Sequence, residues 1–290
     1  TEREKCAALF KSTNKTKGHS IFVYAQLLYA IPTMIYIKFL LVALICGRNR
    51  KTRYSSIFYS FISMGALTAV LIHIPRTIFD IIGKRPEWFC PTFRALSQPT
   101  YWLDTYVYFI QVWDTLRMLS GTMIVLYRFH SMSDAYSAKR VWESHKASVI
   151  CGTIVLPTVL YAPIWASPSY AIIDDEEMIF KNEGLDWYNE AVHCCISLVC
   201  AIIVLLSQVI LLCTRLSSKL IRESIDRSLY FVGLVEIVLI VIYAVFQCLE
   251  FARDWFDPSL PSWILYVSLL LSDALGFCPP WALFIASSYI

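Results

Sequence analysis

The sequence consists largely of long apolar runs, separated by shorter segments that hold most of the charged residues. As a helix, each run would be long enough to cross a hydrocarbon layer of about 30 Å. Only 16% of the residues are charged, whereas a soluble domain carries about 25%. We therefore predict an all-α membrane protein, a bundle of seven transmembrane helices.

The predicted boundaries follow the apolar runs. Residues 1–20 form an N-terminal tail, residues 21–287 form the seven-transmembrane domain, and residues 288–290 begin the tail after the last helix. The helices are expected at about 21–46, 55–80, 100–129, 147–167, 188–216, 227–253 and 261–287.

Basic residues in the loops predict the orientation, because loops rich in Lys and Arg stay on the cytoplasmic side. One side of the bundle collects Arg48, Arg50, Lys51, Arg53, Arg128, Lys139, Arg140, Lys146, Arg215, Lys219, Arg222 and Arg227. This places the N-terminus outside and the C-terminus inside. The basic N-terminal tail opposes that orientation, but Asn14 begins an Asn-Lys-Thr glycosylation sequon, which is used only on the lumenal side. We predict an extracellular tail glycosylated at Asn14.

Polar side chains inside the apolar runs mark the interior of the bundle, because ionisable groups in lipid are costly unless they face one another or water. At about 100° per residue, five runs each carry one polar stripe. From these stripes we select as candidate ligand-binding residues Arg76, Asp80, Gln111, Asp114, Arg117, His193, Tyr243, Gln247, Tyr266 and Asp273.

Asp114 and Arg117 share one face of the third run and allow two interpretations. Arg117 could bind a ligand carboxylate through its planar guanidinium. Alternatively, it could form an internal salt bridge with Asp114, Glu236 or Asp273. The same choice exists for Arg76 and Asp80. An aromatic series on the third run could likewise be a ligand cage, or packing and an interfacial belt. This series consists of Trp102, Tyr106, Phe109 and Trp113.

Several functional classes lack their required residues. Retinal proteins need a lysine in the last helix, and none follows Pro261. No GxSxG or HExxH motif points to an enzyme. The ten cysteines show no metal-ligand spacing, so we expect no metal site. We also expect no cofactor and no nucleic-acid partner. A seven-helix, ligand-gated odorant channel with its N-terminus inside stays the alternative to a receptor.

Four short motifs resemble those of nematode serpentine chemoreceptors, most closely the gamma class. They are Tyr29–Tyr36 (YAIPTMIY), Ser56–Tyr59 (SIFY), Leu126–Phe129 (LYRF) and Cys278–Trp281 (CPPW). The resemblance implies a G-protein-coupled receptor in the plasma membrane of chemosensory neurons, in their cilia. Its partners would be a heterotrimeric G protein and a small organic ligand such as an ascaroside-type pheromone. Pairing with a second receptor is left open.

The resemblance also implies roles for single residues. Arg128 is similar to the arginine of the Asp/Glu-Arg-Tyr motif of rhodopsin-like receptors, although Tyr127 and Phe129 replace its neighbours. The disulfide usual in such receptors, from the top of the third helix to the next outer loop, has no clear equivalent here. That loop has no cysteine, so Cys90 would have to reach Cys6, Cys194 or Cys195, of which we favour the last two. The expected G-protein surface comprises Arg128, Lys139, Arg140, Arg215, Lys219 and Arg222.

Overall fold

The computed structural model describes residues 56–84, 100–174, 177–182, 184–217, 227–257, 259–261 and 263–288, together with Ile31, Pro32, Ile35, Lys38 and Ala95. Its elements are α3 (Ser56–Lys84), α5 (Tyr101–Ser133), α6 (Ala135–Ser144), α7 (Lys146–Leu160), the 3₁₀ helix η2 (Ala162–Ala166), β1 (Ser169–Asp174), β2 (Glu177–Asn182), α8 (Asp186–Ser217), α9 (Arg227–Trp255) and α10 (Trp263–Ser288).

Five stretches of the described chain are helical, long and apolar enough to cross a membrane. They cover Ser56–Pro75, Lys146–Ala166, Asp186–Cys213, Tyr230–Trp255 and Trp263–Ile285. The chain is therefore a multi-pass helical membrane protein. The first predicted helix, 21–46, falls almost wholly outside the described residues. The third predicted helix corresponds to α5, which is 33 residues long. It is not among the five apolar stretches, and it carries charged side chains near its middle. Seven spans, and the side on which each terminus lies, stay predictions.

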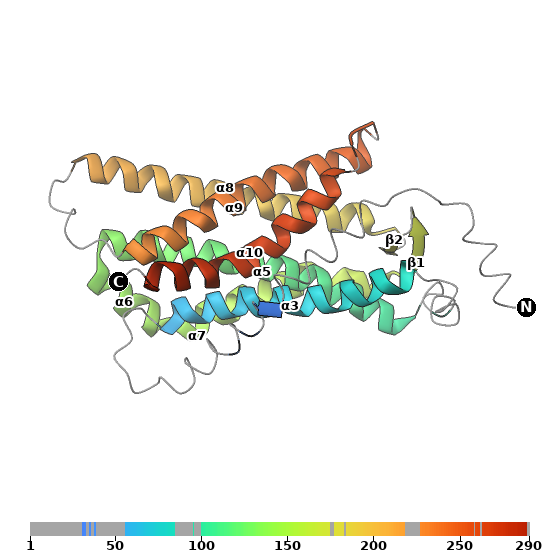
Figure 1. The fold of residues 1–290 in the computed structure, drawn as a ribbon, viewed down its shortest axis with the longest axis horizontal. Coiled ribbons are helices and arrows are strands. Elements are labelled where there is room, and N and C mark those ends of the chain that lie inside the picture. Colours follow the sequence, from blue (N-terminus) through green and yellow to red (C-terminus); the bar gives the residue numbers. More distant parts are fainter. Residues whose placement is uncertain are drawn as a thin grey trace, which may run out of the picture.

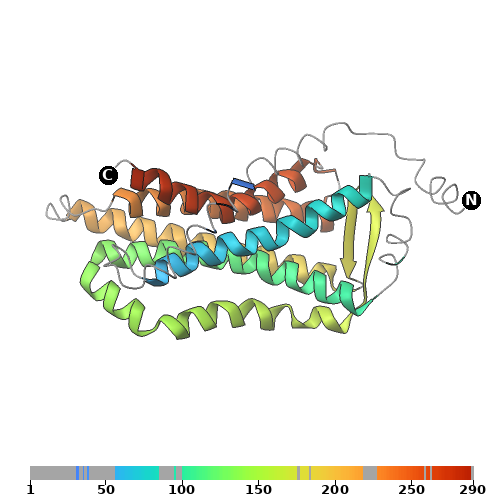
Figure 2. The ribbon, with the colours of Figure 1, turned by 60° about the horizontal axis from the view of Figure 1, so that its bottom comes forward.

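The long helices lie lengthwise beside one another (Figure 1). The two strands cover one end of the bundle, which we call the hairpin end, and α6 lies at the opposite end together with the end of α10 (Figures 1 and 2). Helix α5 is central, because it packs against α3, α7, α8, α9 and α10. Every other long helix can therefore place side chains against α5.

Apolar packing between the long helices forms separate cores. Toward the α6 end, α3, α5, α9 and α10 share a core that includes Phe58, Phe61, Tyr127 and Val232. A second core, between α5, α8, α9 and α10, includes Ile240. The outer face of α8 exposes an apolar surface suited to lipid, formed by Leu198, Val199, Ile202, Leu205, Leu206, Val209 and Ile210.

Two elements occur where the sequence analysis expected loops. Helix α6 is held against α3, because the Glu143 carboxylate accepts hydrogen bonds from the backbone N–H of Ser56 at 2.6 Å and from its hydroxyl at 3.0 Å. Trp142 also donates from its indole nitrogen to Nδ1 of His130 at 3.1 Å. The antiparallel hairpin of β1 and β2 pairs Ser169 with Asn182.

The helix expected at 147–167 ends as an α-helix at Leu160 and continues as η2. Pro163 explains the change, because proline has no N–H to continue the α-helical hydrogen bonds. The Asn182 side chain then donates to the carbonyls of Ile164 at 3.2 Å and Ser167 at 2.9 Å. These bonds fasten the hairpin to the end of this span.

Candidate functional site

A buried ion pair lies in the middle of the bundle. Arg117 donates hydrogen bonds to Asp114, one turn earlier on α5, and to Ser272 on α10. Its second terminal nitrogen, Nη1, lies 3.6 Å from Oδ1 of Asp273. Ser272 in turn donates to Oδ1 of Asp114 at 2.5 Å. One guanidinium is thus shared between carboxylates of two helices.

The second oxygen of the Asp114 carboxylate faces α8 and α9. The Tyr243 hydroxyl donates to Oδ2 at 2.9 Å, and Nε2 of His193 lies 3.3 Å from the same oxygen. The His193 ring also lies 2.7 Å from the Tyr243 hydroxyl. On its other side, Nδ1 lies 3.2 Å from the hydroxyl of Thr115 and 3.3 Å from that of Tyr161. These contacts extend the cluster to α8, α9 and the end of α7.

Asp273 extends the cluster to α3, since Nδ1 of His73 lies 3.6 Å from its carboxylate. We call this set the polar layer. It consists of His73, Asp114, Arg117, His193, Tyr243, Ser272 and Asp273. All of α3, α5, α8, α9 and α10 contribute to it. Burying two carboxylates near one arginine is favourable only when their remaining lone pairs are hydrogen-bonded, as several are here.

The structure bears on the two interpretations of Arg117. Its side chain is 0% exposed and its charge is used by Asp114 and Asp273. In this conformation Arg117 therefore makes the internal ion pair and is closed to a ligand. The Asp114 side chain is 21% exposed, so the acid is the more accessible member of the pair.

Three other candidate residues lie nearer the hairpin end. Gln111 is half-buried one turn before Asp114, and Tyr266 is half-buried on α10. Gln247 donates to Glu250 at 3.3 Å and to Ser268 at 2.5 Å, which joins α9 to α10. The side chains of Arg76 and Asp80 fall outside the described part of the structure.

The aromatic series on α5 does not form one cage. Trp102 is 80% exposed, while Phe109 stacks on Trp113 with ring centroids 5.3 Å apart. Trp187, Trp255 and Trp263 are also exposed near this end. Tryptophan at the ends of spanning helices is typical of the membrane–water interface. The position of Trp102 therefore favours the interfacial interpretation.

Glycines allow the helices to approach at the level of the polar layer. A Cβ on Gly276 would overlap Ala69, and would lie 2.8 Å from the backbone oxygen of Gly65 and 3.0 Å from Cδ of Arg117. A Cβ on Gly121 would lie 2.6 Å from a carboxylate oxygen of Glu236. The missing side chain at these two positions leaves space for the Arg117 and Glu236 side chains.

Glu236 is a polar feature that the candidate list did not include. It is fully buried on α9, and neither carboxylate oxygen has a hydrogen-bond partner among the described residues. Together with Arg117 and Ser120 it lines a narrow gap between the helices. Its place on the polar stripe of the sixth run was visible in the sequence, but its lack of a partner was not.

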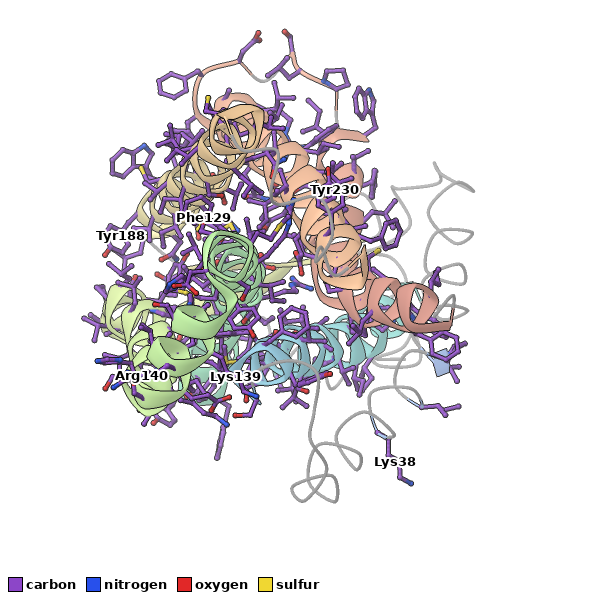
Figure 3. The ribbon with its side chains drawn as sticks, turned by 90° about the vertical axis from the view of Figure 1, so that its left-hand side faces the viewer. Lys38, Phe129, Lys139, Arg140, Tyr188 and Tyr230 are labelled. Carbon is purple, nitrogen blue, oxygen red and sulfur yellow. The ribbon has the colours of Figure 1, made fainter. Side chains whose placement is uncertain are left out.

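The α6 end holds the residues predicted to face a G protein. Arg128 is only 1% exposed, and its guanidinium lies 4.6 Å from the centre of the Tyr230 ring on α9. Its side chain crosses Gly233, where a Cβ would collide with it. Lys139 and Arg140 are exposed on α6, away from the centre of the bundle (Figure 3). The side chains of Arg215, Lys219 and Arg222 fall outside the described residues.

Two cysteine thiols meet between α8 and α9. Sγ of Cys194 lies 3.4 Å from Sγ of Cys248. Cys195 is exposed, whereas Cys90 lies outside the described residues, so its predicted pairing stays a prediction. Within the described ranges, no three His, Cys, Asp or Glu side chains are grouped as metal ligands would be.

Taken together, the fold and the polar layer define a multi-pass membrane protein whose helices meet at a fixed set of buried polar contacts. The family model of the Srg chemoreceptors matches residues 23–290, and the chain belongs to that family. The predicted resemblance to the gamma class of serpentine receptors is thereby confirmed. No match was found among curated individual proteins.

Proposed function

We propose that this chemoreceptor is a G-protein-coupled receptor with its N-terminus outside the plasma membrane of a sensory neuron. The observation that supports this function best is the polar layer, in which five helices converge on two acids and one arginine. Such a cluster has few satisfactory arrangements, because every buried charge needs its partners. A ligand that favours one arrangement over another would shift the whole bundle between two states.

The ligand enters from the hairpin end and contacts the side of the layer nearest to it. Asp114 is partly exposed there, and Gln111, Tyr243, Gln247 and Tyr266 lie on the same helices toward that end. The family context supports a small organic ligand, and an ascaroside-type pheromone is the specific candidate by family analogy. While the polar layer is closed, Arg117 influences the ligand only through its partners Asp114 and Asp273. If the layer opens, Arg117 can bind an acidic group of the ligand directly.

Coupling takes place at the α6 end. Arg128 is held under α9 by the Tyr230 ring, so it becomes accessible to a G protein only when α9 moves away from α5. Lys139 and Arg140 are already exposed beside it, and Arg215, Lys219 and Arg222 follow α8 in the sequence. This cationic surface would bind the G protein only in the open state, in which Arg128 is exposed.

A ligand screen in cells that carry a promiscuous G protein tests this proposal, with membrane current recorded alongside. We expect G-protein activation by at least one ligand, abolished or strongly reduced by Arg128→Ala while ligand binding stays within a few fold. Arg253→Ala is the matched control, because Arg253 lies at the other end of α9 and pairs with its neighbour Asp254 at 2.7 Å. Equal signalling by the two variants would refute the coupling site.

Ligand-gated current without G-protein activation would favour the alternative channel with an inward N-terminus. Orientation gives an independent test. An epitope before Thr1 should be accessible on intact cells, and glycosidase should shift the band of the wild type but not of Asn14→Gln. Access only after permeabilisation would support the channel.

A further inference from the structure

The contact between Cys194 and Cys248 has no role in the proposed signalling mechanism. The two thiols come from different helices, α8 and α9, and are 54 residues apart in the chain. Their sulfur atoms lie 3.4 Å apart. A disulfide needs a separation of about 2.05 Å, so a small movement of the two side chains would close the bond.

The depth of the pair in the bundle follows from the helix bounds. Cys194 lies eight residues after the start of α8 at Asp186, and Cys248 lies seven residues before the end of α9 at Trp255. At 1.5 Å per residue, both thiols lie about 10–12 Å below the hairpin end. Cys194 is 8% exposed and Cys248 is half-buried. Since Cys194 is buried at that depth, the oxidant that suits this pair is a small uncharged one such as hydrogen peroxide.

We propose that Cys194 and Cys248 form a peroxide-sensitive thiol pair that closes to a disulfide and joins α8 to α9. The more accessible Cys248 sulfur attacks one oxygen of hydrogen peroxide, which breaks the O–O bond and gives a sulfenic acid and one water. The Cys194 sulfur then attacks the sulfenic sulfur, loses its proton and releases a second water. Overall, two thiols and one peroxide give one disulfide and two waters.

The location of the pair would connect oxidation to the polar layer. Cys194 directly follows His193, which is 2.7 Å from Tyr243 on α9, and Cys248 lies five residues beyond Tyr243. The disulfide would therefore fix α8 against α9 about one turn from the contact through which both helices reach Asp114. It would restrict their separation at the hairpin end without touching the α6 end.

Cys194 cannot form this disulfide and also the family-type bond to Cys90. The matched control is Cys195, which follows Cys194 directly in the sequence but is exposed on α8. The sulfur that contacts Cys248 belongs to Cys194. Since Cys194 and Cys195 fall in one proteolytic peptide, a Cys195→Ser background makes the assignment unambiguous.

The test uses the full-length receptor in native membranes, treated with hydrogen peroxide, denatured in N-ethylmaleimide and mapped by mass spectrometry with and without reduction. We expect a reducible link between the Cys194 and Cys248 peptides in the wild type and in Cys195→Ser, and its loss in Cys194→Ser. Recovery of both cysteines as alkylated thiols, or a link from Cys194 to Cys90, would overturn the proposal. Absence of any link in the wild type overturns the proposal even where a variant expresses poorly, and the Cys195→Ser measurement assigns a link that is present to Cys194.

Discussion

The close approach at Gly276 gives a quantitative prediction about the packing of the polar layer. In Gly276→Ala, the new methyl group would overlap the Ala69 side chain, and it would also press on the Gly65 backbone oxygen and on Cδ of Arg117. Overpacking a core costs about 1–3 kcal/mol, and the better helix propensity of alanine recovers at most about 1 kcal/mol. We expect a net loss of about 1–2 kcal/mol of unfolding free energy.

Thermal melting of the purified receptor in lipid nanodiscs, followed by tryptophan fluorescence, measures this loss. At about 2–4 °C per kcal/mol for a chain of this size, Gly276→Ala should melt about 2–8 °C below the wild type. Gly152→Ala is the matched control, because a Cβ at Gly152 on α7 would meet no described atom within 4 Å. It should melt at or slightly above the wild type.

Gly65→Ala is a second comparison, since its Cβ would make an ordinary contact of 3.7 Å with Ser120. Its melting temperature should lie close to that of the control. If Gly276→Ala melts as high as Gly152→Ala, then α10 does not approach α3 and α5 as closely as the structure has it. The position of Arg117 in the polar layer would then also be wrong.

Three further predictions concern buried or capping charges. Arg117→Met should cost about 3–5 kcal/mol of unfolding free energy because it leaves buried acids unpaired, and adding Asp114→Asn should recover part of that loss. Expression and melting temperature measure both effects. Additive losses in the double variant would contradict the pairing. Glu236→Gln should melt no lower than the wild type, because it removes a carboxylate that has no described partner. A drop of several degrees in melting temperature would mean that the carboxylate does have a partner. Glu143→Gln should lower the melting temperature by a few degrees, because it weakens the two hydrogen bonds to Ser56; unchanged melting would mean that α6 is not held by this contact.

The sequence predicted the family and a multi-pass helical membrane protein because both depend on local patterns. Apolar runs of bilayer length specify helices whatever lies beside them, and the four family motifs are contiguous. The stripe on the third run also identified Asp114 and Arg117 as interior residues. Their choice of partner was not predictable, because an arginine with acids on several helices has several equivalent solutions until the helices are packed.

The features that sequence reasoning missed depend on contacts between distant segments. Helix α6 is short and polar, and it is fixed by the bond between Glu143 and Ser56, which are 87 residues apart. The hairpin of β1 and β2 is held by Asn182 against the end of the candidate span Lys146–Ala166. The isolation of Glu236 likewise follows from the bare backbone of Gly121 opposite it. No local pattern marks these contacts.

Helix α9 connects the thiol pair, the polar layer and the α6 end. Near the hairpin end it carries Cys248, in the polar layer it carries Tyr243, and toward α6 it carries Tyr230 over Arg128. Tyr243 and Tyr230 are 13 residues apart in one helix of 29 residues, or about 20 Å along its axis. Because the helix is continuous between them, a tilt that breaks the bond from Tyr243 to Asp114 would also displace Tyr230. In the proposed receptor, a ligand at Asp114 would therefore need only to alter how α9 packs on α5 to expose Arg128, without any separate signal passing through α5 itself.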